Sequence, residues 1–546
     1  MKKITQFNYK LHTPLFFIKW LIFGNMSSIK TENCIAIDFG TSNTAVMVYK
    51  NGICQNPVYT VENYYCIPSV AVIDKDGIVV PDHLSSLSNS KGYIFNVKRI
   101  LGKVKSQFKD SEIKEEMFHA PIKFDEHENP YFEVSYGLGK NKGSRNVYPI
   151  EVVTAILKKC KSEAEKLLDS HVEVRDCVMT IPNYFFDTSK IALQEAAKKA
   201  GLNVLYFVKE PTAAGIRYIT GDEEIKEGET VLVFDFGGGT LDLTIMVRNG
   251  NRFEVKAQGG DPNLGGNKID ELFCDYVLQK YKNEYGEDLL GTDITSKKYK
   301  RQYSDLLLSC RQLKELLSSS HAADMSLSDL SENIECITVT QDDFNIMILE
   351  EGGILRRVDN AMSDLFSKTD IDTKGISYVI LVGGSSKIPY IQEHLKKYFN
   401  SIPVSIMLKY NPHTTVAEGA MMVKVNNMYQ EVSESLECCL GFKVMDDRSS
   451  SELQIDLHPG LKIPIFVTRY FNLSGNDIDV YRSFNGKERI EGTILVKQAL
   501  EEFGQTMIKV KITCEKDTSV EYIVLSEFGR EIGRINIQPK VQKTVA

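Results

Sequence analysis

The chain lacks the cysteine patterns that mark zinc sites and disulfide scaffolds. It has eleven cysteines in 546 residues, yet no CxxC pair and no cysteine–histidine cluster of zinc spacing. Cys438 and Cys439 are adjacent, which is poor geometry for a disulfide. We therefore expect reduced thiols and a cytoplasmic protein.

Long apolar runs and excess positive charge are also missing. The apolar stretch from Leu15 to Phe23 contains Lys19 and is far shorter than the roughly 20 residues that span a bilayer. The formal net charge is −8, which argues against a general nucleic-acid binder. We expect neither a nucleic-acid partner nor stable membrane insertion.

The first 30 residues differ from the rest of the chain. Lys2 and Lys3 precede the apolar stretch, as in a secretory signal, but no clean small-residue cleavage site follows. We favour a disordered extension over residues 1–30, or a start codon set too early. A working signal or anchor is the alternative.

The composition that remains is typical of soluble globular domains. Hydrophobic residues make up 42% and charged residues 25% of the chain. A length of 546 residues is too great for one core, so two to four domains are expected.

The most informative stretch covers residues 231–242. Residues 231–234 form an apolar, β-branched segment typical of a buried strand, and Asp235 ends it. Gly237, Gly238 and Gly239 follow, which lets backbone N–H groups approach a ligand closely. Thr240 adds a hydroxyl, and Asp242 a second carboxylate. Phosphate-binding amides beside carboxylates indicate a Mg²⁺–nucleotide site, although a buried strand with a glycine hairpin would look similar.

The same plan occurs once more, and a glycine turn follows an apolar segment in a third place. Residues 35–41 form an apolar strand that ends in Asp38, Phe39, Gly40 and Thr41. A third glycine turn, residues 383–385, follows the apolar segment 379–382. The repeat predicts two similar half-domains that each contribute one phosphate clamp to a cleft between them.

Seven motifs in order resemble those of the heat shock protein 70 (DnaK-type) chaperone family, within the actin and sugar-kinase superfamily. They extend over about residues 33 to 425 and lie at 37–41, 95–102, 181–185, 210–214, 235–240, 263–266 and 382–385.

The resemblance implies an α/β fold: an actin-like ATPase, a duplicated ribonuclease-H-like two-lobed domain, over residues 31–430. A linker over 431–439 and a small β-sandwich over 440–546 would follow, without the family's helical lid. Short alternating segments with turn signals between them support the sandwich. They lie at 463–468, 477–481, 490–496, 507–512 and 520–525.

The resemblance also assigns roles to individual residues around ATP and Mg²⁺. Catalytic roles would fall to Lys98, Glu210, Asp235 and Thr240. The metal, directly or through water, would be held by Asp38, Glu210, Asp235 and Asp242. The nucleotide would contact Gly40, Thr41, Ser42, Gly237, Gly238, Gly239, Thr240, Lys314, Ser318, Gly383, Gly384 and Ser385. Pro182 and Lys190 would relay the nucleotide state to the second domain.

Two of these residues have simpler interpretations. Lys98 could be a solvated surface lysine, the usual position of this residue type. Glu210 could place favourable negative charge at the N-terminus of a helix, a role that is compatible with holding water or metal.

The chain departs from the family pattern at five positions. Lys190 and Lys387 stand where arginine is usual, which keeps the charge but loses the bidentate fork. Arg311 and Glu315 replace an acid and an adenine-stacking arginine, and His413 stands where an acid is usual. A carboxylate cannot supply a cation–π contact. We therefore expect weaker or altered nucleotide affinity and altered signalling between domains.

The function that follows is an ATPase that drives binding and release of unfolded or extended polypeptide. Its partners would be such clients, with J-domain and nucleotide-exchange co-chaperones. One alternative is a nucleotide-gated co-chaperone or scaffold with little ATP turnover. Another is a small-molecule kinase of the same superfamily.

Overall fold

The computed structural model describes most of the chain between residues 33 and 426 and eight strands beyond it. The described segments are 33–58, 65–83, 92–108, 118–136, 143–168 and 172–426, the last with breaks at 184, 222–224, 251, 329, 332–333, 400–404 and 408–409. The predicted extension, residues 1–30, and nearly all of the predicted linker, 431–439, lie outside the described residues.

The first lobe is built on a sheet with strand order β12-β11-β1-β2-β3, in which β4 also pairs with β2. Parallel pairs join β1 to β11 and β11 to β12, whereas β1–β2 and β2–β3 are antiparallel. The strands are β1 (Cys34–Phe39), β2 (Asn43–Lys50), β3 (Ile53–Gln55), β4 (Ile67–Pro68), β11 (Asp176–Ile181) and β12 (Asn203–Lys209).

The second lobe repeats this topology. Its strand order is β15-β14-β13-β18-β19, with parallel pairs β13–β18 and β18–β19 and antiparallel pairs β13–β14 and β14–β15. The predicted duplication is thus confirmed, strand for strand. The strands are β13 (Thr230–Phe236), β14 (Leu241–Asn249), β15 (Arg252–Asp261), β18 (Tyr378–Val382) and β19 (Ser405–Met407).

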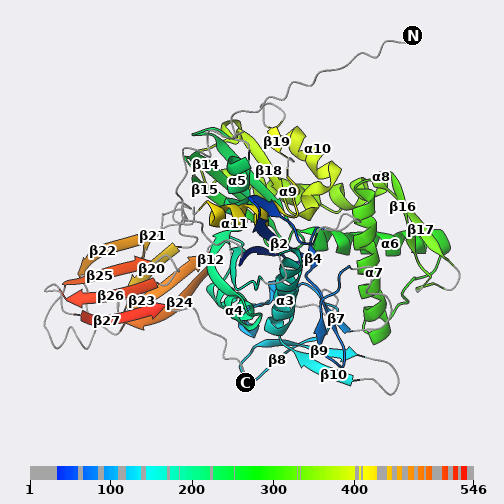
Figure 1. The fold of residues 1–546 in the computed structure, drawn as a ribbon, viewed down its shortest axis with the longest axis horizontal. Helices are drawn as coiled ribbons and strands as arrows, with labels where there is room; N and C mark the ends of the chain where they lie inside the picture. The colour runs from blue at the N-terminus through cyan, green and yellow to red at the C-terminus, as the bar shows by residue number, and fades with distance from the viewer. Residues whose placement is uncertain are drawn as a thin grey trace, which may run out of the picture.

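Two helices pack between the two sheets, α5 (Glu210–Gly221) and α11 (Thr415–Val425) (Figure 1). They cross closely, because a Cβ added at Gly419 would lie 1.8 Å from the carbonyl oxygen of Ala213. Arg217 donates to Glu418 at 2.5 Å and lies over the Tyr410 ring at 3.7 Å. Apolar residues from both sheets and both helices form one shared core here, so the lobes meet along a packed seam.

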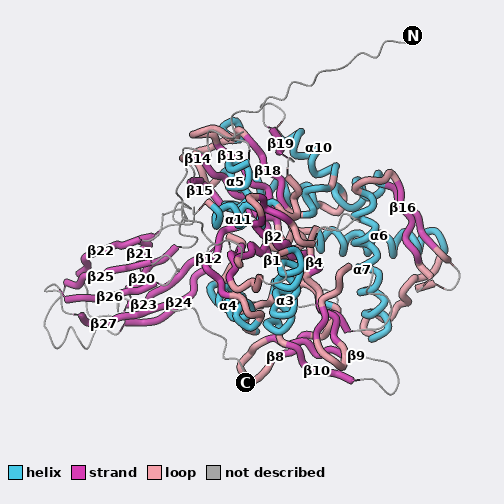
Figure 2. The backbone as a smooth tube through the Cα atoms, in the orientation of Figure 1, coloured by secondary structure: helices cyan, strands magenta, loops and turns pink. Residues whose placement is uncertain are grey.

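Each lobe carries additional elements on its outer side (Figure 2). The first lobe adds β5 (Ala71–Ile73), β6 (Ile78–Val79), β7 (Gly92–Ile94), β8 (Ile122–Phe124), β9 (Pro130–Tyr136), β10 (Gly143–Val147), α3 (Pro149–Leu167) and α4 (Asp187–Lys199). The second adds α6 (Gly266–Tyr285), α7 (Lys297–Leu317), β16 (Ala322–Ser326), β17 (Cys336–Thr340), α8 (Gln341–Asp343), the π-helix Phe344–Glu350, α9 (Ile354–Phe366) and α10 (Pro389–Tyr398).

Local sequence explains where these helices begin and end. Pro149 occupies the first turn of α3, where its missing N–H costs nothing. Helix α7 starts at Lys297, where the Ser296 hydroxyl caps it by accepting from Tyr299 N at 3.1 Å. Gly286, at φ 77°, ends α6 in the left-handed conformation.

Eight strands beyond residue 438 form two four-stranded antiparallel sheets, β21-β20-β23-β24 and β22-β25-β26-β27. Strand β24 of one sheet contacts β27 of the other. All five segments predicted from alternation overlap described strands. The strands are β20 (Cys439–Val444), β21 (Glu452–Leu457), β22 (Ile465–Asn472), β23 (Ile478–Phe484), β24 (Lys487–Ile494), β25 (Met507–Cys514), β26 (Val520–Ser526) and β27 (Glu531–Ile537).

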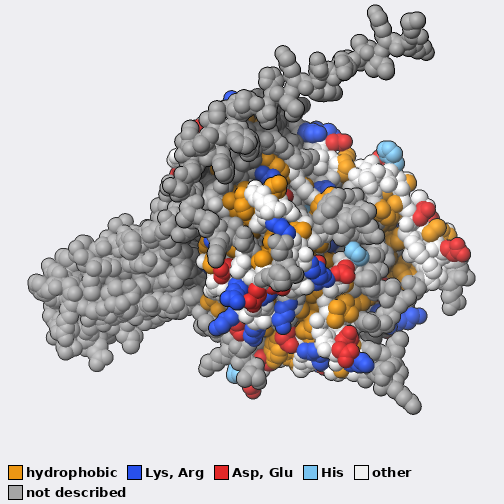
Figure 3. Space-filling model, in the orientation of Figure 1, with side chains coloured by type: hydrophobic (Ala, Val, Ile, Leu, Met, Phe, Trp, Pro, Cys, Tyr) orange, Lys and Arg blue, Asp and Glu red, His pale blue; other side chains and the backbone are white. Residues whose placement is uncertain are grey.

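The described surface is chemically mixed. Figure 3 shows lysine and arginine side chains interspersed with aspartate and glutamate on the visible face of the two lobes. No described helix combines the length and apolar character needed to cross a membrane.

Candidate functional site

The first glycine turn connects β1 to β2 and is held in place by hydrogen bonds from Ser69. The Ser69 hydroxyl donates to the carbonyl oxygen of Gly40 at 2.8 Å, and Ser69 N donates to Ser42 O at 2.9 Å. A Cβ on Gly40 would lie 2.2 Å from Asn43 O, so only glycine fits this turn. Asp38, at the end of β1, accepts from the Thr180 hydroxyl at 2.7 Å.

The second turn connects β13 to β14 in the same way. Gly237 N donates to Thr240 O at 3.0 Å, and the Thr240 hydroxyl donates to Asp242 at 2.7 Å. The start of α6 braces this turn, because Asn267 N donates to Gly238 O at 2.7 Å. The turn is therefore held by its own strands and by a helix of the same lobe.

The two turns come from different lobes and touch each other. A Cβ on Gly238 would lie 2.1 Å from the Ser42 hydroxyl oxygen, and one on Gly239 would lie 3.1 Å from that of Thr41. A side chain larger than hydrogen at either glycine would force Ser42 or Thr41, or the turns themselves, to shift. The predicted phosphate-binding residues of both half-domains thus meet across one cleft.

Four carboxylates gather around these turns: Glu210 and Asp242 are buried, and Asp38 and Asp235 are half-buried. Burial is the main cause that raises the pKa values of Asp38, Glu210, Asp235 and Asp242 above their ordinary range. For Glu210 the pKa is raised to about 7. For Asp235 the negative charges of the other three acids add to burial. The carboxylates predicted to hold a metal therefore lie within one electrostatic cluster.

Lys98 supplies the positive charge that acts on this cluster. Its ammonium donates to Glu210 at 2.9 Å, with only 10% of the side chain exposed. Burial by itself would lower the pKa of Lys98, but Glu210, Asp38 and Asp235 outweigh it and raise that pKa. The structure thus excludes the surface-lysine interpretation. Glu210 begins α5, so its helix N-terminal position and its place in the cleft coincide.

The donor set suits a hydrated magnesium ion. Four buried or half-buried carboxylates share one ammonium, so a divalent cation would relieve the excess negative charge. Among the described residues, no three Asp, Glu, His or Cys side chains are grouped closely enough to ligate one ion directly. Mg²⁺ usually keeps several waters and takes one or two carboxylates, so ligation partly through water fits this arrangement.

The third glycine turn is attached to the second. The Ser385 hydroxyl donates to Gly237 O at 2.9 Å, and a Cβ on Gly383 (φ 80°) would lie 2.4 Å from Phe236 O. A Cβ on Gly384 would meet the His413 ring at 2.8 Å. These residues form a wall that continues outward from the phosphate turns.

Helix α7 completes this wall. The Lys314 ammonium is buried, 2.6 Å from Asp270 and 3.2 Å from the Gly266 carbonyl oxygen. The Ser318 hydroxyl donates to Lys314 O at 3.3 Å. Both side chains of this helix that are predicted to contact the nucleotide therefore make bonds within the protein. Asp270, which pairs with Lys314, was not predicted as a site residue.

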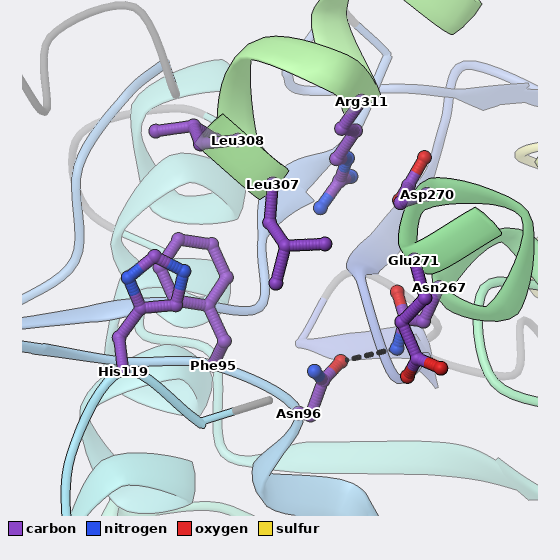
Figure 4. A pocket seen from close by; sticks show the side chains of 9 residues that line it. All are labelled: Phe95, Asn96, His119, Asn267, Asp270, Glu271, Leu307, Leu308 and Arg311. Carbon is purple, nitrogen blue, oxygen red and sulfur yellow. Dashed lines mark hydrogen bonds between the residues drawn. The ribbon is translucent and has the colours of Figure 1, made fainter. Parts of the chain in front are cut away.

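A hollow of about 480 Å³, counting its open mouth, lies between the lobes beside α7. Figure 4 shows its lining: the Phe95 and His119 rings on one side, and Leu307 and Arg311 projecting from α7. Asn267 donates to Asn96 at 2.7 Å across it, which adds a direct bond between the lobes.

Both residues of the predicted relay belong to the first lobe. Pro182 follows the last residue of β11, and Lys190 is on α4, with its ammonium over the Phe207 ring at 5.5 Å. Thr180, on β11 two residues before Pro182, bonds to Asp38. The sequence does place Thr180 near the end of a predicted strand. It does not show how that strand pairs with β1, so the contact between Thr180 and Asp38 could not be predicted.

Two matching lobes with facing glycine turns define the actin-like, duplicated ribonuclease-H-like fold. The comparisons then narrow the class. A family model described as Hsp70 protein matches residues 34–435. A curated Heat shock 70 kDa protein from Neurospora crassa is 32% identical over 392 residues, which cover 71% of this chain and 57% of that protein. The chain belongs to the Hsp70 family. It matches less than two thirds of the length of that relative.

Proposed function

We propose that this protein is an ATP-dependent chaperone, which binds and hydrolyses ATP and couples this cycle to binding and release of extended polypeptide. One observation carries the proposal. The glycine turns of the two lobes meet at Gly238 and Ser42, with a buried lysine and four carboxylates beside them. A triphosphate between the turns would contact both lobes, so its hydrolysis could change how they pack.

Each group has a definite chemical task in this proposal. Backbone N–H groups of residues 40–42 and 237–240 would bind phosphate oxygens. Lys98 would neutralise charge that develops on the transferring phosphoryl group, and Asp235 would orient the attacking water. Asp38, Glu210 and Asp242, with Asp235, would hold Mg²⁺ directly or through water; the ion would offset phosphate charge.

The coupling step would run from the cleft to the C-terminal sheets. Thr180 bonds to Asp38, so β11 connects the acid cluster to Pro182 and, through α4, to Lys190. The antiparallel sheets β20–β27 would offer the strand edges and pockets that extended peptides bind. J-domain and nucleotide-exchange proteins are proposed as co-chaperones, in the cytoplasm.

Single-turnover hydrolysis of Mg²⁺–ATP tests the proposal. Lys98→Ala should slow hydrolysis about 100-fold or more, as for loss of one transition-state electrostatic group. The matched control is Lys123→Ala, which removes an exposed lysine paired with Glu133. Added unfolded peptide should stimulate the wild type and the control. Normal turnover by the Lys98 variant would contradict the proposal.

A nucleotide-gated scaffold is the second candidate, and the Lys98–Glu210 ion pair favours it. The ammonium at 2.9 Å from Glu210 is already engaged and would have to release in part to reach a phosphate. ATP binding without turnover in the wild type would support the scaffold. ATP consumption only with an added sugar or other metabolite would support a kinase instead.

A further inference from the structure

The main chain that carries Lys98 forms a short turn between two left-handed residues. Lys98 lies at the centre of a single 3-10 turn, Val97–Arg99, and the hydrogen bonds of such turns are poorer in geometry than those of an α-helix. Asn96 stands before the turn at φ 56°, and Gly102 follows it at φ 71°. The left-handed region is costly for a residue other than glycine. The position of Lys98 therefore depends on what the segment 96–102 packs against.

The second lobe holds the start of this segment. Asn267 donates to the Asn96 side chain at 2.7 Å (Figure 4), and Arg99 donates to Asn263 at 2.9 Å in an exposed contact. Both partners belong to the loop and helix start that follow β15. At this end the segment is thus attached to the lobe opposite its own.

Helix α4 holds the end of the segment. Ser189, which is only 2% exposed in the first turn of α4, donates its hydroxyl hydrogen to Leu101 O at 2.6 Å. Gly102 lies directly against the same turn: an added Cβ would be 2.4 Å from Thr188 O and 2.6 Å from Ser189 N. Backbone meets backbone here with no side chain between. Helix α4 therefore fixes the main chain three residues after Lys98.

The hydrogen bond from Ser189 does something that apolar packing alone does not. Val97, Ile100 and Leu101 are almost fully buried in the core of the first lobe. Their packing is non-directional, so it fixes how deep the segment lies. A hydrogen bond prefers a narrow range of directions, so it also fixes the orientation of the Leu101 carbonyl group. The ammonium of Lys98 projects from the turn whose orientation is set in this way.

We propose that Ser189 is a positioning residue for ATP hydrolysis. Its hydrogen bond to Leu101 O sets the orientation of the turn that carries Lys98, and so sets how the ammonium meets the transferring phosphoryl group. Ser189 acts only through Lys98. The inference rests on the proposed function, because that function assigns the phosphoryl group to Lys98.

Single-turnover hydrolysis of Mg²⁺–ATP by the full chain with Ser189→Ala tests this role. Removal of the hydroxyl should slow hydrolysis about tenfold, because a shift of the catalytic group by a fraction of an ångström already costs rate. Calorimetric titration should show ATP affinity within about twofold of the wild type, since an interaction used mainly in the transition state contributes little to ground-state binding.

Thr154→Ala is the matched control. The Thr154 hydroxyl, on α3 of the same lobe, is also buried and donates to a carbonyl oxygen, that of Ile150, at 2.7 Å. Both variants lose one buried hydroxyl–carbonyl bond, and their midpoints of urea unfolding are compared. Thr154→Ala should hydrolyse ATP at the wild-type rate. Equal slowing in the two variants would assign the effect to a general loss of stability and would overturn the inference.

The double variant Ser189→Ala with Lys98→Ala shows whether Ser189 acts through the lysine. Against Lys98→Ala alone, the second substitution should change the rate by less than about twofold, because no ammonium remains to be positioned. A full tenfold loss in that background would overturn the inference and leave the proposed function standing. A wild-type rate in Ser189→Ala would also overturn it. If the wild type does not hydrolyse ATP, the proposed function fails together with the inference.

Discussion

The two glycine turns share one plan but differ in their electrostatic surroundings. In the first lobe, Asp38 accepts from Thr180 at 2.7 Å, and Lys98 opposes the effect of burial on it. In the second lobe, the charges of Glu210, Asp242 and Asp38 add to burial in raising the pKa of Asp235. Lys98 opposes them only weakly. The two halves thus differ in degree, because a lysine and a hydroxyl offset burial at Asp38, whereas three neighbouring acids add to burial at Asp235.

The largest expected effect comes from removing each acid in turn. Asp235→Asn should weaken Mg²⁺-dependent nucleotide binding about 100-fold and raise the free energy of unfolding of the free protein by about 1–2 kcal/mol, because it removes an uncompensated buried charge. Asp38→Asn should instead lower that free energy, because Lys98 and Thr180 lose a partner.

Calorimetric titration and denaturant unfolding of both variants measure these effects. Asp364→Asn is the control, since Asp364 pairs with Lys368 at 2.6 Å at the exposed end of α9. Equal stability changes in Asp38→Asn and Asp235→Asn would contradict the asymmetry between the lobes.

The pH dependence of stability provides the next test. The pKa of Glu210 is raised from its ordinary 4.5 to about 7, with burial as the main cause. Between these values the folded protein keeps a proton that the unfolded chain releases. Stability that is fully present below pH 4.5 is therefore lost as pH rises through 7, by about 3 kcal/mol for this group. Glu210→Gln should flatten the curve between pH 5 and 7.5.

Urea unfolding of the free protein at several pH values shows this slope. Saturating Mg²⁺ should reduce the slope of the wild type, since a cation favours the charged acids. A variant curve parallel to that of the wild type would mean that Glu210 titrates normally.

The contact between the two turns predicts a smaller loss of nucleotide affinity, which a second substitution should reverse. Gly238→Ala places a Cβ against the Ser42 hydroxyl and should weaken nucleotide binding about tenfold by separating the lobes. Gly237→Ala is the matched control, because its Cβ would lie 3.7 Å from Thr240 O, an ordinary contact.

The double variant Gly238→Ala with Ser42→Gly should recover most of the lost affinity. Equilibrium binding of a fluorescent ATP analogue compares all three proteins. Failure of the second change to rescue the first would show that the turns are not in contact in solution.

Much of this site could be predicted from the sequence, because the glycine-containing motifs mark where each strand ends in a turn. The strand–Asp–Phe–Gly–Thr repeats located Asp38 and Asp235, and the duplicated sheets followed from them. Contacts between distant segments could not be predicted in the same way, since Thr180 meets Asp38, and Gly238 meets Ser42, only through tertiary packing. Lys314 also showed no sign of its ion pair with Asp270, 44 residues earlier in sequence.

Outside the site, alternation predicted five of the C-terminal strands and missed three. Strands β20 and β21 do alternate, with every second residue apolar up to Val444 and Leu457, but they are only six residues long; in β27, Gly533 interrupts the two-residue period. Their existence depends on pairing with neighbouring strands, which a single segment does not reveal.

The smallest expected effect concerns the relay. Lys190→Arg would restore a planar fork on α4 and should raise peptide stimulation of ATP hydrolysis about twofold, while basal hydrolysis stays the same. Steady-state hydrolysis with and without an unfolded peptide measures the ratio. A change in the basal rate alone would place Lys190 outside any route between the domains.

Isothermal titration calorimetry of the purified chain with ATP tests the central claim most directly. If the two glycine turns close on one triphosphate, ATP should bind at a single site. Its affinity should rise at least tenfold when Mg²⁺ is added, because the cation offsets the charge of the acids beside the turns. The absence of binding heat with ATP and Mg²⁺ together, or the same affinity with and without the metal, would contradict the account.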